Sequence, residues 1–451
     1  MFPQNVIKIA KTLKNAGFDA YVVGGAVRDT VLCKLPHDYD IATNATPAQV
    51  KELFDRTIDT GIEHGTVTAM FGKEGYEITT YRCDGKYSDG RHPDSVSFVD
   101  TIEDDLSRRD FTMNAMAIDP VTEELVDPFG GETDLHMGVI RTVGNAEDRF
   151  KEDALRMMRA ARFKAQFGFT IEHRTYDAMT DMHGLISGLS KERIHEELNK
   201  TLQGRFADIG IKAMELTGIL REISPELSEM FYCGQETPWH YENVGSHSLS
   251  VLMNAKEKGG SLNVLWAALL HDMGKPEAKV IKEDGSCHFH NHAAHSGKLA
   301  YNLLRELKFS NAEIDRIVKL VEYHDTVYAD IKDVRTFVAA HDKDFLDELY
   351  ILQLADAMAH TPRYAEEAVA EKEAFRKDIL TVIRDKTAIR IKDLKIDGSD
   401  LKELGYEEGI EIGLELEKLW KLCIEDPSLN DEKTLYDLAE KDLKDEERDE
   451  R

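Results

Sequence analysis

Two aspartates separated by one residue, Asp38 and Asp40, have the clearest potential for chemistry in this sequence. On a strand, side chains two residues apart point to the same face, so both carboxylates would converge on one spot. Two like charges there are costly unless a cation neutralises them, and carboxylate oxygens are ligands that suit Mg²⁺. Most Asp-x-Asp triplets are only solvated turns, so a true site also needs a third carboxylate on a nearby strand. Glu77 alternates correctly for this role, and we prefer it to Asp110.

A pair of glycines, Gly24 and Gly25, separates an apolar run from a helix-like segment shortly before the two aspartates. Glycines let backbone N–H groups approach a phosphate, and the helix N-terminus adds partial positive charge. Arg28, in the first turn, would add a two-pronged contact. A Gly-Gly pair alone is more often a tight turn, but beside an acid pair it predicts a site where divalent ions and a triphosphate meet.

Asp153, Arg156, Arg159 and Arg162 recur every third residue in a segment that is helical by composition, which predicts one slowly drifting stripe on a helix. Asp only accepts hydrogen bonds and Arg only donates them. Cytosine and adenine present an amino donor beside a ring-nitrogen acceptor, whereas uracil and guanine present the reverse pattern. A fixed Asp153–Arg156 pair would hold C and A and leave U and G with a buried mismatch of ~1–3 kcal/mol. An exposed helix with ordinary ion pairs is the alternative.

Taken in order, these motifs resemble the head of class II tRNA nucleotidyltransferases, the CCA-adding enzymes, to which bacterial poly(A) polymerases are closely related. The resemblance is carried by Gly24–Asp29, by the Asp38 and Asp40 pair, and by Arg108–Ala115. It implies an α+β fold, in which a nucleotidyltransferase head of the DNA polymerase beta type with a small mixed sheet precedes an all-α neck, body and tail. It also implies metal-dependent, template-independent addition of C, C and A to the 3′ end of tRNA from CTP and ATP, with release of pyrophosphate.

The resemblance extends to individual residues. Arg109 is expected to contact the sugar or phosphates, and the helix around Lys191–Leu198 to support the stripe without chemistry of its own. The polar loop Cys83–Asp94 resembles a mobile loop that the family needs to switch from C to A addition. The catalytic residues are then Asp38, Asp40 and Glu77, the first two holding Mg²⁺, and the nucleotide-binding residues are Gly25, Arg28, Arg109, Asp110, Asp153, Arg156, Arg159 and Arg162.

A second group of residues is rich in histidine. The segment Ala268–Lys275, which contains His271-Asp272, resembles HD-superfamily metal-dependent phosphohydrolases. Imidazole and carboxylate ligands suit transition metals or Mg²⁺, which would activate water against a phosphoester. A block that only braces the RNA-binding body is the alternative, and the choice of ligands among neighbours such as His295 and Asp325 stays open. The expected second divalent site contains His247, His271, Asp272, His292, His324 and Asp356.

The elements that would position these residues change along the 451-residue chain. Short apolar runs at Ala20–Val23, Thr66–Phe71 and Glu77–Tyr81 predict strands in the head, whereas strand patterns almost vanish after Glu147. The division that follows is a catalytic head (1–140), a helical neck that selects the base and binds RNA (141–235), an HD-type helical domain (236–362) and a helical tRNA-binding tail (363–451).

The composition of the chain limits the partners and the cellular compartment that we expect. The 57 basic and 85 acidic residues give a net charge of −28, which argues against nucleic acid as a partner unless cations cluster locally. Five scattered cysteines, no apolar run of about 18 residues and no signal-peptide pattern predict a cytoplasmic protein without a membrane partner. The expected partners are the acceptor arm and 3′ end of tRNA, CTP and ATP, and no protein partner is evident.

Three other functions compete with CCA addition. A poly(A) polymerase would share much of the head and neck, but many of those enzymes end in a basic extension and this chain ends in an acidic one. An HD phosphohydrolase with a degenerate head is the second, and a non-catalytic RNA-binding protein is the third.

Overall fold

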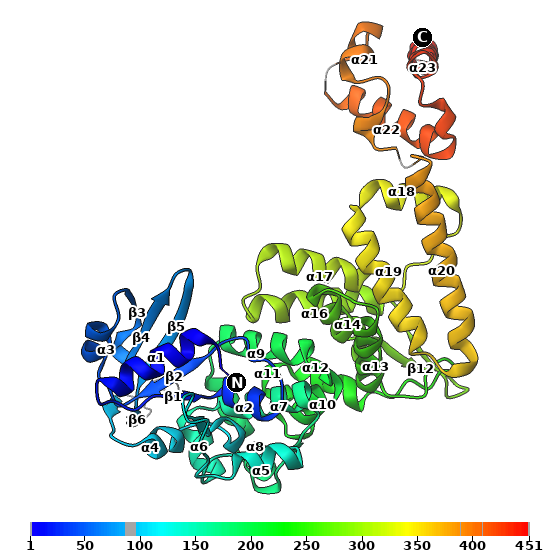
Figure 1. Ribbon diagram of the computed structural model, residues 1–451. Helices are drawn as coiled ribbons and strands as arrows, with labels where there is room; N and C mark the ends of the chain where they lie inside the picture. The colour runs from blue at the N-terminus through cyan, green and yellow to red at the C-terminus, as the bar shows by residue number, and fades with distance from the viewer. Residues whose placement is uncertain (1, 86–95, 388, 408, 450–451) are drawn as a thin grey trace. The chain divides into compact units, whose positions relative to one another are not determined.

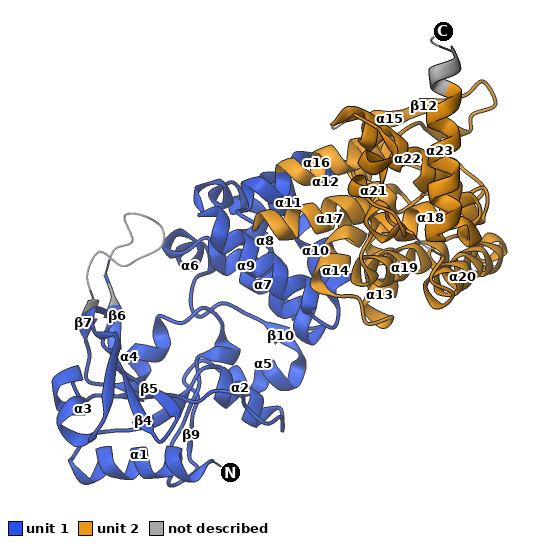
Figure 2. Ribbon diagram, turned by 90° about the horizontal axis from the view of Figure 1, so that it is seen from above, with its two compact units in different colours: residues 1–228, 303–309 blue, residues 229–302, 310–451 orange. Residues whose placement is uncertain are grey.

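The computed structural model describes residues 2–85, 96–387, 389–407 and 409–449, and the chain divides into two compact units. Unit 1 contains Met1–Ser228 and Leu303–Phe309; unit 2 contains Glu229–Asn302 and Ser310–Arg451 (Figure 2).

Unit 1 begins with a mixed sheet whose described strands run in the order β3-β4-β5-β2-β1-β8-β9 (Figure 1). At its centre β1 pairs antiparallel with β2, with Val23 opposite Asp40, and β2 pairs parallel with β5, with Ile41 opposite Ile78. The carboxyl end of β1 and the amino end of β2 therefore meet beside the middle of β5. The strands are β1 (Tyr21–Val23), β2 (Asp40–Thr43), β3 (Thr57–Gly61), β4 (Thr66–Phe71), β5 (Glu74–Thr80), β8 (Ala117–Ile118) and β9 (Leu125–Val126), with β6 (Arg82–Asp84) paired to β7 (Val96–Phe98).

Short helices accompany this sheet. Helix α3 begins with a capping box, in which the hydroxyl of Thr46 and the side chain of Gln49 each bond the other's backbone N–H, and it packs against β4 and β5. The helices of this region are α1 (Gln4–Asn15), α2 (Gly25–Val31), α3 (Pro47–Leu53) and α4 (Ile102–Ser107).

The rest of unit 1 is mainly helical. Helix α7 packs against α9 and α10, and small residues bring α7 and α10 together: a Cβ atom on Gly210 would stand only 2.5 Å from that of Ala165. The helices are α5 (Gly131–Met137), α6 (Ala146–Glu152), α7 (Leu155–Phe167), α8 (His173–Met182), α9 (Lys191–Gln203), α10 (Ala207–Leu216), α11 (Ile219–Ile223) and α12 (Pro225–Glu229), beside the parallel pair β10 (Val139–Ile140) and β11 (Thr170–Ile171).

Unit 2 is built around α13, α14 and α19, with Trp266 of α14 almost fully buried. Its first helices and hairpin are α13 (Val244–Glu257), α14 (Leu262–Leu270), α15 (Lys275–Ala278), β12 (Lys279–Ile281) and β13 (Cys287–Phe289). They are followed by α16 (His292–Glu306), α17 (Asn311–Tyr323), α18 (Ile331–Ala340), α19 (Lys343–Met358) and α20 (Pro362–Arg384).

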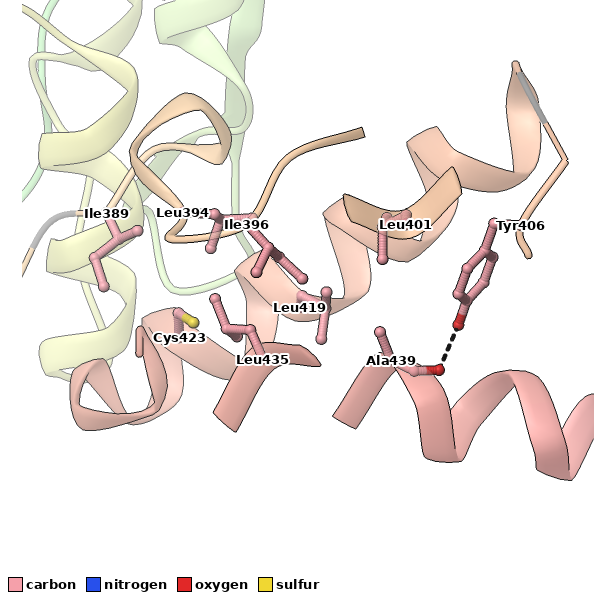
Figure 3. Packing of buried hydrophobic residues seen from close by; sticks show 9 residues of the cluster. All are labelled: Ile389, Leu394, Ile396, Leu401, Tyr406, Leu419, Cys423, Leu435 and Ala439. Carbon is pink, nitrogen blue, oxygen red and sulfur yellow. Dashed lines mark hydrogen bonds between the residues drawn. The ribbon is translucent and has the colours of Figure 1, made fainter. Parts of the chain in front are cut away.

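The C-terminal helices of unit 2 have a small core of their own, shown in Figure 3. Leu401, Leu419 and Leu435 are fully buried in it, and the Tyr406 hydroxyl donates a hydrogen bond of 2.9 Å to the carbonyl of Ala439. The helices are α21 (Gly398–Leu404), α22 (Ile410–Glu425) and α23 (Glu432–Asp449).

The expected fold class, an α+β head followed by helical segments, is confirmed. The apolar runs predicted as strands are β1, β4 and β5. Of the loop Cys83–Asp94, Cys83 and Asp84 belong to β6, and the part from residue 86 onward lies outside the described residues. The described helices are each too short or too polar to cross a membrane.

Candidate active site

Three acidic side chains gather where β1, β2 and β5 meet. The strand β2 begins at Asp40, and Asp38 precedes it by two residues, so only one of the two aspartates is part of the strand. The register of β2 against β5 places Glu77, one residue before Ile78, beside Asp40. Asp38, Asp40 and Glu77 all line one pocket of about 800 Å³. The side chain of Glu77, which the strand alternation singled out, therefore lies in the same pocket as Asp38 and Asp40.

The electrostatics of Asp40 fit a cation site. Asp40 keeps contact with solvent, yet the protein around its carboxylate removes enough water to raise its pKa. The negative charges of Glu77 and Asp38 raise this pKa further, and Arg109 opposes the shift. A divalent ion would remove this repulsion, since the oxygens are of the kind that Mg²⁺ prefers. The three acids are not as tightly spaced as a closed metal site: in the described part of the chain, groups of three or more ligand atoms within 4.8 Å of one another occur only in unit 2.

A second pocket, of about 590 Å³, shares Asp40 with the first and is rich in arginine. Gly24 has a φ of +69°, and a Cβ atom there would stand 3.1 Å from the Nη1 atom of Arg109, so glycine is needed both for the backbone and for the approach of that arginine. All residues predicted to bind the nucleotide line this pocket: Gly25, Arg28, Arg109, Asp110, Asp153, Arg156, Arg159 and Arg162.

Buried acids hold these arginines in place. Arg159 forms an ion pair with Asp110, and Arg162 with Glu197 at 3.1 Å. Burial would raise the pKa of Asp110, but the charge of Arg159 and hydrogen bonds from Asn114 and Arg159 lower it to about 2. Burial, helped by the charge of Arg159, lowers the pKa of Arg162 to about 10. Asp110 is thus an ionised carboxylate that fixes an arginine, and it lines the arginine-rich pocket but not the pocket of the three acids.

The sequence predicts that Asp153, Arg156, Arg159 and Arg162 lie on one continuous helix, and this prediction is wrong for Asp153. Helix α6 ends at Glu152, Asp153 is extended with φ −148° and ψ 104°, and α7 begins at Leu155. The break places the Asp153 carboxylate at the start of α7, where its Oδ1 atom accepts a 3.0 Å hydrogen bond from the Leu155 N–H. Asp153 and Arg156 still line the same pocket. The helix break therefore changes the contacts of the Asp153 carboxylate but leaves both side chains at the pocket.

Both members of the predicted base-reading pair already have protein partners. The Asp153 Oδ2 atom accepts a 2.7 Å hydrogen bond from Arg193. Arg156 donates to Glu152 at 2.6 Å and to the carbonyl of Arg108 at 3.0 Å. A base in this pocket must therefore share these groups with the protein or displace Arg193.

Several pocket residues were not predicted. Arg193 lies on α9, in the segment expected to carry no chemistry, yet it lines the pocket. Asn114 joins Arg28 to Asp110 through two hydrogen bonds of 3.0 Å. Asp105 pairs with Arg108 and Arg109, and its spacing three and four residues before them was a local pattern that would have revealed it. Nothing local indicated the partners of Arg193 and Glu197, which lie 40 and 35 residues away.

Phe163 is the most unexpected part of the pocket. It is 3% exposed, and the guanidinium carbons of Arg28, Arg159 and Arg162 lie 5.6, 5.5 and 4.4 Å from its ring centroid. The negative face of an aromatic ring attracts a cation, so one ring draws together three like charges that repel each other. The ring thus adds to the acid partners that hold Arg159 and Arg162 in the pocket.

The histidine group forms a second site, inside unit 2. The His247 Nε2 atom lies 2.9 Å from Asp356 Oδ1, His271 Nε2 lies 3.2 Å from Asp272, and His292 Nε2 lies 3.3 Å from Asp272. His324 joins two of the closely spaced ligand groups, one of which also includes Asp325. The structure thus brings together all six predicted ligands, whereas His295 points elsewhere, with its Nδ1 atom 3.9 Å from Glu277.

The chemistry of this donor set fits a metal ion. Burial and the charge of His271 lower the pKa of His324 to about 4, so at neutral pH this imidazole is uncharged and its ring nitrogen is free to bind a metal. Burial alone would raise the pKa of Asp272, but His271 and Lys275 hold it well below its usual range. The Lys275 ammonium lies 2.6 Å from Asp272 and donates to Gln235 at 2.8 Å. Burial alone would lower the pKa of His271, but nearby carboxylates, chiefly Asp272, raise it. The site therefore offers ionised carboxylates together with the uncharged imidazole of His324.

Comparisons with known proteins agree with this geometry. Three family models match: a poly A polymerase head domain over residues 20–141, a probable RNA and SrmB-binding site of polymerase A over residues 168–231, and an HD domain over residues 244–361. A CCA-adding enzyme of Lactobacillus helveticus is 34% identical over 417 residues, which cover 92% of this chain and 91% of that enzyme. One of Lactiplantibacillus plantarum is 50% identical over 213 residues, 47% of this chain and 52% of that enzyme.

A solved structure is similar over the whole length. The crystal structure of the Bacillus stearothermophilus CCA-adding enzyme in complex with CTP matches with a TM-score of 0.70 and 28% identity, and the match covers 100% of both chains.

Replacing Phe163 by leucine tests its part in the pocket. Leucine keeps the site apolar but removes the ring that attracts the arginines, so we expect CTP affinity to fall by about 1–2 kcal/mol, roughly five- to thirtyfold. Calorimetric titration with CTP measures this. Phe150→Leu is the matched control, because Phe150 is equally buried and lies on the neighbouring helix α6. Equal CTP affinity in the two variants would show that the ring has no such part.

Proposed function

The chain belongs to the CCA-adding enzyme family, and from this premise we propose which of its residues add C, C and A to the 3′ end of tRNA. The reaction uses CTP and ATP: the terminal hydroxyl of the RNA loses its proton, its oxygen bonds to the α-phosphorus, and the bond to the departing pyrophosphate breaks. One observation carries the assignment. Asp40 lines both the carboxylate pocket and the arginine pocket, so acids suited to a metal ion adjoin cations suited to a triphosphate.

The carboxylates form the reacting end of the site. We assign Asp38 and Asp40 as ligands of Mg²⁺, which when bound would neutralise phosphate charge and favour an ionised hydroxyl. Glu77 stands beside Asp40 on the next strand and is the carboxylate placed to receive the hydroxyl proton. The raised pKa of Asp40 supports this assignment, because burial and the negative charges of Glu77 and Asp38 all disfavour its ionised form, and a bound cation would offset them.

The arginine pocket binds and orients the nucleoside triphosphate. The backbone at Gly25 opens helix α2, and Arg28 and Arg109 supply guanidinium groups next to it. Because acids and the Phe163 ring already hold these arginines, little reorganisation is needed when the phosphates arrive.

Asp153 and Arg156 read the base in this proposal. The carboxylate accepts the amino group of C or A, and the guanidinium donates to the ring nitrogen. Arg193 and the Leu155 N–H hold the two oxygens of Asp153, so that U and G, which offer a carbonyl where an amino group is needed, meet a carboxylate that cannot turn away. The unpaired buried groups that result cost ~1–3 kcal/mol.

The remaining sections of the chain have proposed parts as well. We divide it into the catalytic head (1–140), the neck (141–235), the HD-type domain (236–362) and the tail (363–451), with the acceptor arm of tRNA as the macromolecular substrate. Membership of the CCA-adding family favours this over a poly(A) polymerase. We place the protein in the cytoplasm, which agrees with five cysteines that are all free thiols.

Asp40→Asn tests the catalytic assignment. We expect CTP incorporation into tRNA that lacks CCA to fall by about 10³-fold or more, since the loss of a metal ligand removes several kcal/mol of transition-state stabilisation. A group whose pKa is raised by folding opposes folding when it is ionised, so the same change should raise the melting temperature of the metal-free protein at neutral pH. Glu74→Gln, in the wall of the same pocket, is the control and should retain activity. Full activity of Asp40→Asn would refute the assignment, and a wild-type enzyme that incorporates ATP but no CTP would be a poly(A) polymerase.

Asp153→Ala tests base selection. We expect the ratio of kcat/KM for CTP to that for UTP to fall by roughly tenfold or more, because the mismatch of ~1–3 kcal/mol against U disappears. Asp148→Ala, an exposed change on the preceding helix, should leave the ratio unaltered. If Asp153→Ala and Asp148→Ala keep the same preference for CTP, then Asp153 does not read the base.

The histidine cluster supports a second candidate activity. We propose that His247, His271, Asp272, His292, His324 and Asp356 hold a divalent metal ion that serves phosphoester hydrolysis, with cyclic phosphates at RNA ends as the substrate class. The close approach of six such ligands inside unit 2 favours this over a merely bracing role.

Asp272→Asn tests the metal site directly. The change removes the carboxylate nearest to His271, His292 and His324, so we expect Mn²⁺ affinity in unit 2, measured by calorimetry, to fall by at least about 100-fold while CTP incorporation persists. His295→Gln is the control, since His295 lies outside the cluster. Unchanged Mn²⁺ binding by Asp272→Asn would contradict the site, and hydrolysis that survives the loss of metal would contradict the activity.

A further inference from the structure

A small basic pocket of about 270 Å³ lies in unit 2, away from the histidine cluster. It is formed by the end of α18, the start of α19, the end of α20 and the segment that follows α20. Val338, Leu346 and Val382 supply apolar lining, while Lys343, Lys386 and Arg390 are all exposed. An apolar lining with three cations suits an anionic group attached to a carbon framework.

The three cations are available for a ligand. No described carboxylate forms an ion pair with Lys343, Lys386 or Arg390. Two acids next to them in sequence are engaged elsewhere: Asp342 caps helix α19 and pairs with Arg316 at 3.2 Å, and Asp385 pairs with Arg384 at 2.7 Å. Three cations without a described acid partner thus line one pocket in a chain whose net charge is −28.

Lys386 occupies a backbone position that normally belongs to glycine. Its φ is +52°, and it ends α20 in a Schellman-type turn, in which the Thr387 N–H bonds the carbonyl of Val382 at 3.1 Å. A residue with a Cβ atom is strained in this conformation, whereas glycine adopts it freely. Lysine at this position lowers backbone stability and presents a cation to the pocket. Backbone strain of this kind is found at binding sites.

We propose that this pocket binds a phosphate of the tRNA backbone, with the apolar lining against the adjoining ribose. The inference rests on the proposed function, which supplies a polyanionic substrate. Because the chain as a whole is acidic, RNA must be held where unpaired cations cluster. The pocket is also smaller than the range of about 300–1,000 Å³ usual for whole small-molecule ligands, as expected for one phosphate and its sugar.

Charge removal with a matched control tests the proposal. The test protein carries Lys343→Gln, Lys386→Gln and Arg390→Gln. The control carries Lys279→Gln, Lys319→Gln and Lys332→Gln, which removes the same charge from lysines of unit 2 that lie outside the proposed tRNA-binding tail and already pair with acids. Dissociation constants for tRNA lacking CCA are measured with both full-length proteins between about 50 and 200 mM salt.

We expect the test protein to bind tRNA roughly three- to tenfold more weakly than the control at low salt. Its plot of log affinity against log salt should also be shallower by about 0.7–0.9, the value for one lost phosphate contact. Equal affinities and equal slopes in the two proteins would overturn the proposal. This outcome is distinct from a failure of the proposed function, in which the wild-type enzyme would add no CTP to tRNA.

Lys386→Gly separates binding from folding. Glycine relieves the left-handed backbone and removes the cation, so this single change should keep or raise the melting temperature and still weaken tRNA binding. Wild-type tRNA affinity in Lys386→Gly, with an unchanged or higher melting temperature, would also contradict the proposal.

Discussion

The parallel pairing of β2 with β5, next to the antiparallel pairing of β2 with β1, is the constraint on which the candidate active site depends. This register sets Asp40 beside Glu77 and opposite Val23, so that the Gly24-Gly25 turn emerges next to the acids. A slip of one residue would turn Asp40 into the core and Ile41 out to solvent, so the buried face of the sheet enforces the arrangement. Burial and the charges of Glu77 and Asp38 together raise the pKa of Asp40, which is the electrostatic penalty of this geometry, and a bound cation would offset it.

On the other side of Asp40, arginines gather in a second pocket, and nearby acids balance part of their positive charge. Acids on other elements restrain two of these arginines: Asp110 holds Arg159, and Glu197 of α9 holds Arg162. Phe163, on the same helix as both arginines, contacts each of them. Binding and catalysis by fixed charges require that those charges be in position before the substrate arrives. The helices of unit 1 therefore contribute more than packing, because they carry the counter-charges that keep a cationic pocket folded.

The sequence allowed the prediction of features that depend on local periodicity. The two-residue alternation of a strand favoured Glu77. The resemblance of Ala268–Lys275 to HD-superfamily enzymes led to the six expected ligands of the histidine cluster, although the sequence left the choice among several of them open. Features that depend on distant partners were not predictable in this way. The break at Asp153 interrupts a segment whose composition is helical throughout, and the partner of Asp153, Arg193, lies on a helix that packs beside it only in the folded chain. That the three cations of the basic pocket line it without an ion pair to a described carboxylate is likewise a property of the folded chain, which composition does not reveal.

The most direct test of the account is a crystal structure of the protein with CTP and Mn²⁺, in which anomalous scattering locates the ion. The account predicts Mn²⁺ bound by the carboxylates of Asp38 and Asp40, with the triphosphate of CTP between that ion and Arg28. A bound CTP with no ion between those two side chains, or with the carboxylates turned away from each other, would contradict it.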